Sequence, residues 1–213
     1  MYTPKHFEEH DPGVLHGLIR AYPLGTWVTS AGGELLVNHV PFLLHAERGE
    51  HGTLVAHVPR ANPVWQSFSR EQPSAVVFQG PQAYVSPSWY PSKHANGKAV
   101  PTWNYAVVHA HGMPRVIDDP LWLLAHVSEL SDTHEAGHAV PWKVSDAPTD
   151  FIEKLLAVLV GIEIPIARLE GKWKVSQNRP RHDKLGILAG LQARGGEDSR
   201  AMGELVGRFV GPA

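Results

Sequence analysis

Residues 26–44 read TWVTSAGGELLVNHVPFLL, and this stretch decides the fold class of the chain. The segments Thr26 to Ser30 and Glu34 to Leu44 are rich in β-branched and aliphatic residues, which favour strands. Between them, Ala31-Gly32-Gly33 supplies the backbone freedom that a hairpin turn requires. We therefore predict an antiparallel β-hairpin at the start of a β-rich domain.

The chain continues with short β-segments separated by turn residues. We expect these further strands at Thr53 to Val58, Ser74 to Phe78, Ala83 to Ser86, Trp103 to His111 and Met113 to Asp118. In the segment 103–111 the alternation places Ala106, Val108 and Ala110 on an apolar face, which we assign to the interior. Gly80-Pro81 is expected to separate two of the strands. Six or seven short strands with antiparallel turn signals indicate a small barrel or sandwich.

Helical patterns occur at the start of the chain and throughout its second half. A first helix is expected from Pro12 to Ala21, with Asp11 as its N-cap. Later helices are expected at Pro120 to Thr133, Pro148 to Leu159, Lys184 to Ala193 and Arg200 to Phe209, and a strand at Ile162 to Leu169. We therefore predict a single domain over residues 1–213, with a barrel core at about 24–118 and helical and strand additions at about 119–213.

The composition is that of an ordinary globular protein without cysteine chemistry. Of the 213 residues, 43% are hydrophobic and 19% are charged, and the formal net charge is -2. This balance gives no general attraction to nucleic acids or anionic membranes. The lack of cysteine excludes disulfides, thiolate metal sites and thiol catalysis. Because the first residues do not form a signal peptide and the longest apolar stretch, Leu155 to Ile162, is too short to span a bilayer, we expect a cytoplasmic protein with no membrane contact.

The motif His134-Glu135-Ala136-Gly137-His138 matches the HExxH pattern of zinc proteases. That chemistry needs a helix that continues through both histidines, so that they share one face. Gly137 weakens a helix and Pro141 follows within a turn, so we interpret the motif as a helix end that leads into a loop. His109 and His111 are likewise interpreted as structural, and no metal site is predicted.

Two segments suit a bound anion. In His57-Val58-Pro59-Arg60-Ala61-Asn62-Pro63 a strand ends and a short helix begins, where free backbone N–H groups and an arginine fork suit phosphate oxygens. Alternatively, Asn62 only caps that helix and Arg60 is solvated. The run from Gly171 to Arg181 holds four basic residues, two amides and a hydroxyl around Trp173. This run is either an anion site or a charged edge strand.

Aromatic and hydroxyl residues gather around a proline-rich segment, Pro87 to Pro101, which we predict to be a long ordered loop. The flanking stretches Tyr84 to Lys93 and Val100 to Tyr105 suit the wall of a site for a flat heterocycle. The alternative is a small apolar cluster beneath the loop.

Taken together, these segments resemble the PaiB family of FMN-binding proteins, which carries the label of a negative transcriptional regulator. The residues that carry the resemblance are Met1-Tyr2 with Pro4 and His6-Phe7, His57 to Pro63 with Trp65, Gly80 to Lys93, Gly97-Lys98, Val100 to Tyr105, His134-Glu135, Pro141-Trp142, Asp146 to Pro148 and Gly171 to Arg179. These blocks span nearly the whole chain.

The resemblance implies a flavin split β-barrel related to pyridoxamine-phosphate oxidase: mainly β with added helices, with six antiparallel strands in a Greek key. It also implies a homodimer with FMN at the subunit interface. The residues implied to contact the flavin are Asn38, His39, His57, Arg60, Asn62, Trp103, Asn104, Lys174, Gln177, Asn178 and Arg179. By the same resemblance, Trp103 and Asn104 reach the flavin of the partner subunit, and the residues from Lys174 onward close over the phosphate or the ring. No catalytic residue is predicted.

Three functions remain open at this point. The first is transcriptional repression, where DNA as a partner rests on the family label alone because the final helix pair has a long expected link and few polar residues. The second is a flavin-dependent oxidoreductase, such as a flavin reductase, an oxidase or a haem-degrading relative, in which the flavin supplies the redox chemistry. The third is a binding module without a cofactor.

Overall fold

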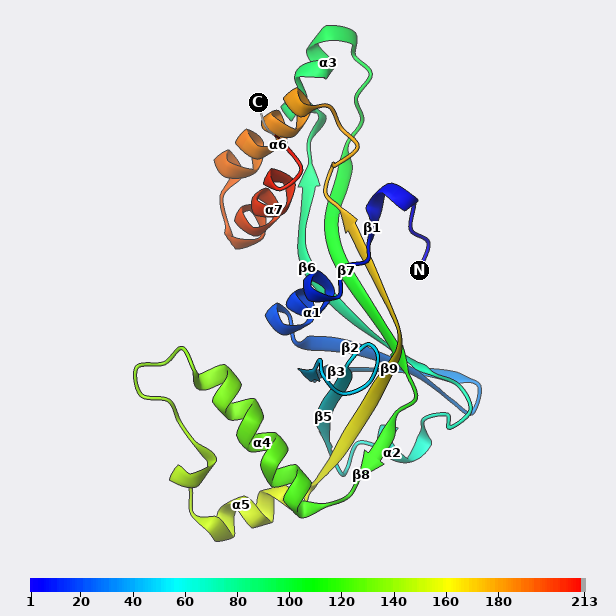
Figure 1. Ribbon diagram of the computed structural model, residues 1–213, viewed down its shortest axis with the longest axis vertical. Coiled ribbons are helices and arrows are strands. Elements are labelled where there is room, and N and C mark those ends of the chain that lie inside the picture. Colours follow the sequence, from blue (N-terminus) through cyan, green and yellow to red (C-terminus); the bar gives the residue numbers. More distant parts are fainter. Residues whose placement is uncertain (212–213) are drawn as a thin grey trace. The chain divides into compact units, whose positions relative to one another are not determined.

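The structure is a computed structural model that describes residues 1–211, with only the backbone described for residues 94–96 (Figure 1). The strands are β1 (Glu8–Glu9), β2 (Leu24–Ala31), β3 (Glu34–Pro41), β4 (Leu43–His45), β5 (Thr53–Pro59), β6 (Ser74–Val85), β7 (Thr102–Gly112), β8 (Arg115–Ile117) and β9 (Leu159–Lys174). The α-helices are α1 (Pro12–Ala21), α2 (Val64–Ser67), α3 (Pro91–Asn96), α4 (Pro120–Glu135), α5 (Thr149–Leu156), α6 (Arg181–Arg194) and α7 (Glu197–Gly207), with 3-10 turns η1 (Lys5–Phe7), η2 (Pro87–Trp89) and η3 (Val144–Asp146).

The strands form one sheet with the order β3-β2-β6-β7-β9-β5-β4, and β1 and β8 each pair with β9. The pairings of β2 with β3 and β6, of β4 with β5, and of β9 with β1, β5 and β8 are all antiparallel. The described sheet therefore has nine strands rather than six. The surplus comes from β1, β4 and β8, which are only two or three residues long, so the six long strands agree with the resemblance.

The chain comprises two compact units, which are described here one at a time. Unit 1 consists of Met1–Ala21, Gln79–His109 and Glu170–Ala213, and unit 2 of Tyr22–Phe78 and Ala110–Leu169. Strands β6, β7 and β9 contribute residues to both units. Because β9 lies between β7 and β5 in the strand order, the sheet extends beyond the 24–118 boundary expected for the barrel core.

The predicted hairpin is confirmed as β2 and β3 of unit 2. Gly32 and Gly33 have φ angles of 57° and 90°, and two successive left-handed residues are what a type I′ hairpin turn requires. The resulting register pairs Trp27 with Asn38. Trp27 is fully buried, and its ring lies 6.1 Å from that of Phe68. The turn chemistry thus places the largest side chain of the hairpin in the core.

The predicted interruption at Gly80-Pro81 is wrong, because β6 runs without a break from Ser74 to Val85. A Cβ on Gly80 would lie 2.8 Å from a methyl carbon of Leu18 on α1, so this glycine marks a close approach between helix and strand rather than a turn. Pro81 is buried in the strand, where the fixed φ of proline is compatible with extended backbone.

The segment 87–101 is not a loop without secondary structure, as the sequence suggested. It contains η2 and α3. The Ser86 hydroxyl accepts a hydrogen bond from the Ser88 N–H, Pro91 begins α3, and Gly97 ends it with a φ of 69°. Two of its three prolines, Pro87 and Pro91, occupy helix starts, where their missing N–H costs nothing.

The helix caps agree closely with the sequence. The Asp11 carboxylate accepts from the Gly13 N–H at 2.7 Å, and the Asp119 carboxylate accepts from the Leu121 N–H at 2.9 Å. The expected six-residue link before the last helix is wrong, because only Gly195 and Gly196 connect α6 to α7. Both glycines have positive φ, which allows this short reversal.

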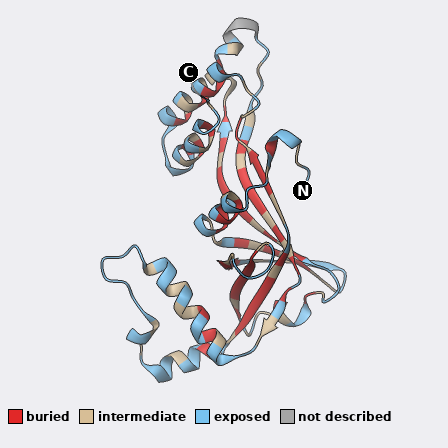
Figure 2. Cartoon of the chain, viewed as in Figure 1, coloured by how far each residue is buried: buried red, intermediate tan, exposed pale blue. Residues whose placement is uncertain are grey.

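Buried residues are concentrated in the strands, whereas α4 and α5 are largely exposed (Figure 2). Only Leu123 and His126 of α4 are buried, and only Leu156 of α5. Among residues 1–211, no helix has both the length and the apolar character that a bilayer span requires.

A substitution at Gly112 tests the packing of unit 2. A Cβ there would lie 2.1 Å from the Pro165 carbonyl oxygen, so the backbone must shift. We expect Gly112→Ala to lower the free energy of unfolding by about 2 kcal/mol in urea titrations followed by circular dichroism. Gly137→Ala is the matched control in the same unit, because no atom lies within 4 Å of its Cβ position. Equal stabilities for the two variants would contradict this account.

Candidate functional site

A small polar cavity in unit 1 gathers several of the predicted flavin contacts. Its volume is about 80 Å³. It is lined by Phe7, Thr102, Asn104, Lys174, Ser176, Asn178 and Arg179. We call it the 174–179 cavity. Strand β7 supplies Thr102 and Asn104, β9 ends at Lys174, the turn that follows supplies Ser176, Asn178 and Arg179, and η1 supplies Phe7.

A reciprocal pair of hydrogen bonds shapes this cavity. The Asn104 amide donates to the Ser176 hydroxyl at 3.0 Å, and that hydroxyl donates to the Asn104 carbonyl oxygen at 3.1 Å. Both side chains are buried. Ser176 has a φ of 64°, a left-handed conformation that is uncommon for serine and that reverses the chain after β9. The Arg179 N–H then closes the turn on the Ser176 carbonyl oxygen at 3.0 Å.

The cavity holds two cations that form no ion pair among the described residues. The Lys174 ammonium donates to the Thr102 hydroxyl at 2.6 Å and to the Trp103 carbonyl oxygen at 2.8 Å, which leaves its third N–H available. Partial burial lowers the pKa of Lys174. In the described part of the chain the Arg179 guanidinium has no hydrogen-bond partner, and it lies over the ring of Tyr90 at 4.9 Å. An anion would complement both charges.

Gln177 and Lys172 belong to the same basic run, but their side chains form hydrogen bonds with backbone groups. The Gln177 side chain accepts from the Val175 N–H at 3.0 Å and donates to the Trp173 carbonyl oxygen. The Lys172 ammonium donates to the Tyr2 carbonyl oxygen at 3.0 Å. Neither residue lines the 174–179 cavity.

Trp103 points away from the 174–179 cavity. Consecutive strand residues face opposite sides of a sheet, and Trp103 lines a separate hollow of about 370 Å³. The residues of this hollow are Met1, Gln79, Gln82, Trp103, Tyr105, Val107 and His109. The Trp103 indole N–H donates to Gln82 at 3.0 Å, and its ring lies 6.1 Å from that of Tyr84. We call this the aromatic hollow.

A larger cavity of about 480 Å³ lies between α6 and α7. Leu188, Leu191 and Arg200 are among the residues that line it. None of the predicted flavin contacts lines it, so size alone does not identify the functional site here.

In unit 2 the predicted residues Asn38 and Asn62 meet each other. The Asn62 amide donates to the Asn38 side-chain oxygen at 2.8 Å, and the Asn62 oxygen accepts from the Val64 N–H at 3.0 Å. Asn62 therefore bonds the first N–H of α2, although Pro63 and not Asn62 occupies the N-cap position that one interpretation gave it. His39 lies on the opposite, exposed face of β3.

Arg60 is occupied by protein partners. Its guanidinium forms two bonds with the Asp118 carboxylate, at 3.1 and 2.5 Å, and donates to the carbonyl oxygens of Ala157 at 3.2 Å and Leu159 at 3.1 Å. A phosphate would have to displace Asp118 to use the same fork. Of the two anion-suited segments, the one at 174–179 thus keeps its cations available.

Comparison with known proteins places these features in a family. Residues 1–168 match the family model described as "Putative FMN-binding domain". The chain belongs to this family. It is therefore an FMN-binding protein by family, in agreement with the cofactor predicted from the resemblance.

Relatives of this FMN-binding family cover nearly the whole chain. The chain is 32% identical to an uncharacterised protein of Emericella nidulans, over 97% of this chain and 96% of that protein. It is 28% identical to "Protease synthase and sporulation protein PAI 2" of Bacillus subtilis (strain 168), again over 97% and 96% of the two chains. The second relative confirms the resemblance to PaiB.

Solved structures confirm the flavin split-barrel fold. The flavocytochrome Anf3 from Azotobacter vinelandii superposes with a TM-score of 0.58 at 14% identity, covering 81% of this chain and 72% of that one. The FAD and heme binding protein from Mycobacterium smegmatis gives a TM-score of 0.57 at 17% identity, covering 78% and 73%. At these identities the likeness shows the fold alone.

Three residues of the 174–179 cavity, Phe7, Thr102 and Ser176, were not predicted as flavin contacts. Ser176 is the hydroxyl residue of the basic run. Thr102 lies two positions before Asn104, so the strand alternation that placed Asn104 would also have found it. Phe7 gave no such signal, because its position depends on the pairing of β1 with β9 across a sequence separation of more than 160 residues.

The HExxH motif of this FMN-binding protein is a helix end, as predicted. Helix α4 ends at Glu135, so no helix continues to His138. The Glu135 carboxylate instead accepts from the Trp142 N–H at 3.0 Å. The geometry of a zinc protease is therefore missing from this segment.

His57, a predicted flavin contact, faces α4. Its Nδ1 lies 3.1 Å from Nε2 of His126, whose ring stacks on Trp122 at 5.1 Å. His126 is 4% exposed, and its Nδ1 has no hydrogen-bond partner among the described atoms. Gly161 of β9 makes room for Trp122, because a Cβ there would lie 2.4 Å from the indole ring.

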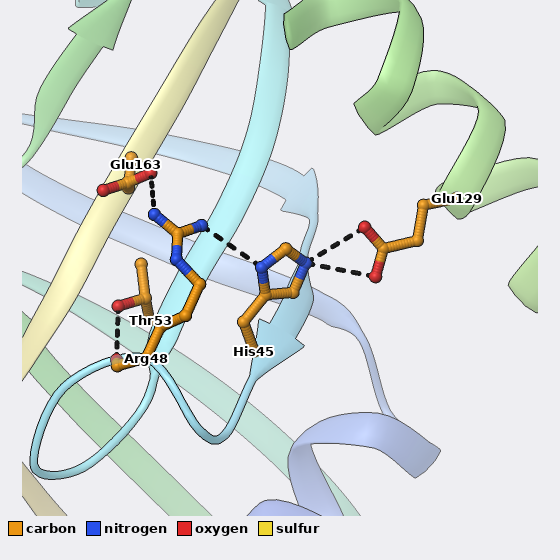
Figure 3. A network of polar contacts seen from close by, with 5 residues as sticks. All are labelled: His45, Arg48, Thr53, Glu129 and Glu163. Carbon is orange, nitrogen blue, oxygen red and sulfur yellow. Dashed lines mark hydrogen bonds and ion pairs between the residues drawn. The ribbon is translucent and has the colours of Figure 1, made fainter.

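A polar network lies beside this histidine pair (Figure 3). His45 places Nε2 3.1 Å from both carboxylate oxygens of Glu129 on α4, and its Nδ1 lies 3.2 Å from the Arg48 guanidinium. Arg48 also donates to Glu163 of β9 at 2.7 Å. Polar contacts therefore hold α4 to the sheet where few apolar side chains are buried.

The histidine pair makes the stability of unit 2 depend on pH. Burial, followed by the nearby His57 and His45, lowers the pKa of His126 from 6.5 to about 4. Between these values the unfolded chain binds the proton and the folded chain does not, so stability is full above pH 6.5 and falls as the pH approaches 4. We expect a loss of about 3 kcal/mol across this window in urea titrations.

His126→Phe keeps an aromatic ring against Trp122 and should flatten this pH dependence. His138→Phe is the control, because His138 is exposed in the same unit. An unchanged pH dependence in His126→Phe would rule out His126 as the responsible group.

Proposed function

We propose that this chain is a flavoprotein that holds the phosphate of FMN in the 174–179 cavity and acts as a homodimer. The observation that carries the proposal is the presence of two cations, Lys174 and Arg179, that line one cavity without any carboxylate partner in the described part of the chain. Cations in such a position favour an anionic ligand.

The residues present fit a phosphate group. A phosphate monoester carries about two negative charges near neutral pH, which two cations match. The amides of Asn104 and Asn178 and the hydroxyl of Thr102 surround the same space. A volume of about 80 Å³ suits a phosphate and is too small for the flavin ring system, which must lie outside it.

An exposed apolar face in unit 2 supports the proposed homodimer. The hairpin β2–β3 exposes Leu24, Leu35 and Val37 by 60%, 72% and 56%, on a sheet face where apolar side chains are usually covered. A single species with the mass of one chain in sedimentation velocity would contradict the homodimer.

A variant of Lys174 tests the phosphate assignment. Lys174→Met keeps the stem and removes the charge, so we expect FMN to bind roughly 10- to 100-fold more weakly while riboflavin binding is unchanged. Quenching of flavin fluorescence on titration measures both affinities. Lys154→Met is the control, because among the described residues its exposed ammonium pairs with Asp150 alone. If wild type quenches neither flavin, the chain is a binding module without cofactor and the proposal fails.

An oxidoreductase role is the leading alternative to a purely binding role. Bound flavin would supply electron and hydride transfer. The aromatic hollow favours this role, because Trp103, Tyr105 and His109 line an open space that suits a second, flat reactant. The two similar solved structures are a flavocytochrome and an FAD and heme binding protein.

Anaerobic mixing with NADH or NADPH tests the redox role. We expect the visible absorbance of the bound flavin to bleach, because reduced pyridine nucleotides donate hydride to flavin. Trp103→Leu should slow this bleaching and leave FMN affinity within a factor of about two, since Trp103 does not line the 174–179 cavity. No bleaching with either donor would count against an enzyme.

Negative transcriptional regulation remains a proposal from the family label. The α6–α7 pair has a link of only Gly195 and Gly196, which is shorter than a helix-turn-helix turn. Arg200 and Arg208 are its exposed cations on α7 and its C-cap. A mobility-shift assay that finds no salt-sensitive binding to its own promoter would argue against direct DNA contact.

A further inference from the structure

Tyr90 is a fully buried side chain of unit 1 that lies outside the 174–179 cavity but touches one of its cations. It follows η2 and precedes α3. Its exposed fraction is 0%, and the Arg179 guanidinium carbon lies 4.9 Å from the centre of its ring. The sequence placed Tyr90 only within the aromatic stretch 84–93 that suits a heterocycle wall, and gave no sign of its contact with Arg179.

The ring, rather than the hydroxyl, makes this contact. The Tyr90 hydroxyl is buried and has no hydrogen-bond partner in the described part of the chain. Burial also raises the pKa of the phenol, so the group is neutral at physiological pH and forms no ion pair with Arg179. A guanidinium over an aromatic face is attracted by the negative face of the ring.

Stacking leaves the guanidinium edge free. The Arg179 side chain has no hydrogen bond or ion pair among the described residues, and the Tyr90 ring is the aromatic contact that restrains it. A planar guanidinium held by its face still presents N–H donors at its edge, and these suit two oxygens of a phosphate. An arginine that is already oriented also loses less rotamer freedom when it binds an anion.

The segment that carries Tyr90 is fixed to α6. The Ser92 N–H and hydroxyl donate to the Asp183 carboxylate at 3.1 and 2.7 Å, and Asp183 is 1% exposed. Gly186 of α6 lies so close to the Trp89 carbonyl oxygen that a Cβ would approach it to 2.0 Å. The ring therefore has a defined position before any ligand binds.

We propose that Tyr90 is a positioning residue for the phosphate of FMN: its ring orients Arg179 so that the cavity distinguishes FMN from riboflavin. This inference rests on the proposed FMN site and adds to it the residue that sets phosphate selectivity. Tyr90 touches no ligand itself and acts only through Arg179.

Flavin titrations of two Tyr90 variants test the proposal. Tyr90→Phe keeps the ring and should leave FMN affinity within about twofold of wild type. Tyr90→Leu removes the ring and should weaken FMN by roughly 3- to 30-fold, with riboflavin affinity unchanged. A purely structural role would weaken both flavins equally, and a role for the hydroxyl would make Tyr90→Phe as weak as Tyr90→Leu. Either result overturns the proposal.

A second variant covers the case in which Tyr90→Leu does not fold. Arg179→Lys keeps the charge but lacks the planar group that stacks, so we expect the same selective loss of FMN affinity. The double variant Tyr90→Phe with Arg179→Lys should match Arg179→Lys alone. Arg179→Lys with wild-type selectivity for FMN would overturn the proposal.

Thermal melts with inorganic phosphate separate this inference from the proposed function. Phosphate should raise the melting temperature of wild type and Tyr90→Phe more than that of Arg179→Lys. If wild type shows this phosphate effect, Tyr90→Leu loses it and wild type binds no FMN, the proposed function fails, while the orientation of Arg179 by Tyr90 stands for a phosphate ligand other than FMN. If FMN binds and both Tyr90→Leu and Arg179→Lys retain full selectivity, the Tyr90 role fails and the proposed function stands.

Discussion

The reciprocal hydrogen bonds between Asn104 and Ser176 are the interaction on which the candidate site depends. They tie β7 to the turn after β9, and a buried amide that found no such partner would cost about 1–3 kcal/mol. Ser176 also has a left-handed conformation, and Arg179, three residues later, lines the same cavity as Lys174 at the end of β9. The buried polar pair therefore lies in the same turn that brings two cations to one cavity.

Local chemistry made much of the fold predictable, and tertiary contacts explain what was missed. The hairpin at Gly32-Gly33 and the helix starts at Asp11 and Asp119 depend on residues within a few positions, so the sequence reveals them. Gly80 was predicted to be part of a turn. The structure shows that it is a glycine because Leu18 packs too close for a side chain, and the sequence does not reveal this contact. The split-barrel topology itself came from the resemblance and not from strand patterns, which also fit a sandwich.

In the candidate site, too, some residues could be predicted from the sequence, whereas others depend on tertiary contacts that the sequence does not reveal. The basic run near Trp173 identified Lys174 and Arg179 through composition alone, and the resemblance added Asn104. Nothing in the sequence indicated that Arg60 would be occupied by Asp118, because the two residues are 58 positions apart. Tyr90 was noticed only as part of an aromatic segment, since its contact with Arg179 depends on how α6 fixes the chain around residue 92.

Cations with a carboxylate partner can be distinguished from cations without one, and we interpret the first as structural and the second as part of a ligand site. In unit 2, Arg60 and Arg48 each have a carboxylate within 2.7 Å, so their charges are balanced in the folded chain. Lys174 is partly buried without such a partner, and its lowered pKa reflects the cost of that desolvation. A ligand that binds only the folded state recovers this cost as binding free energy and stabilises the fold in proportion to its concentration. Two cations without carboxylate partners, Lys174 and Arg179, beside the left-handed Ser176 are therefore expected where an anion binds. A purely structural role would not explain them.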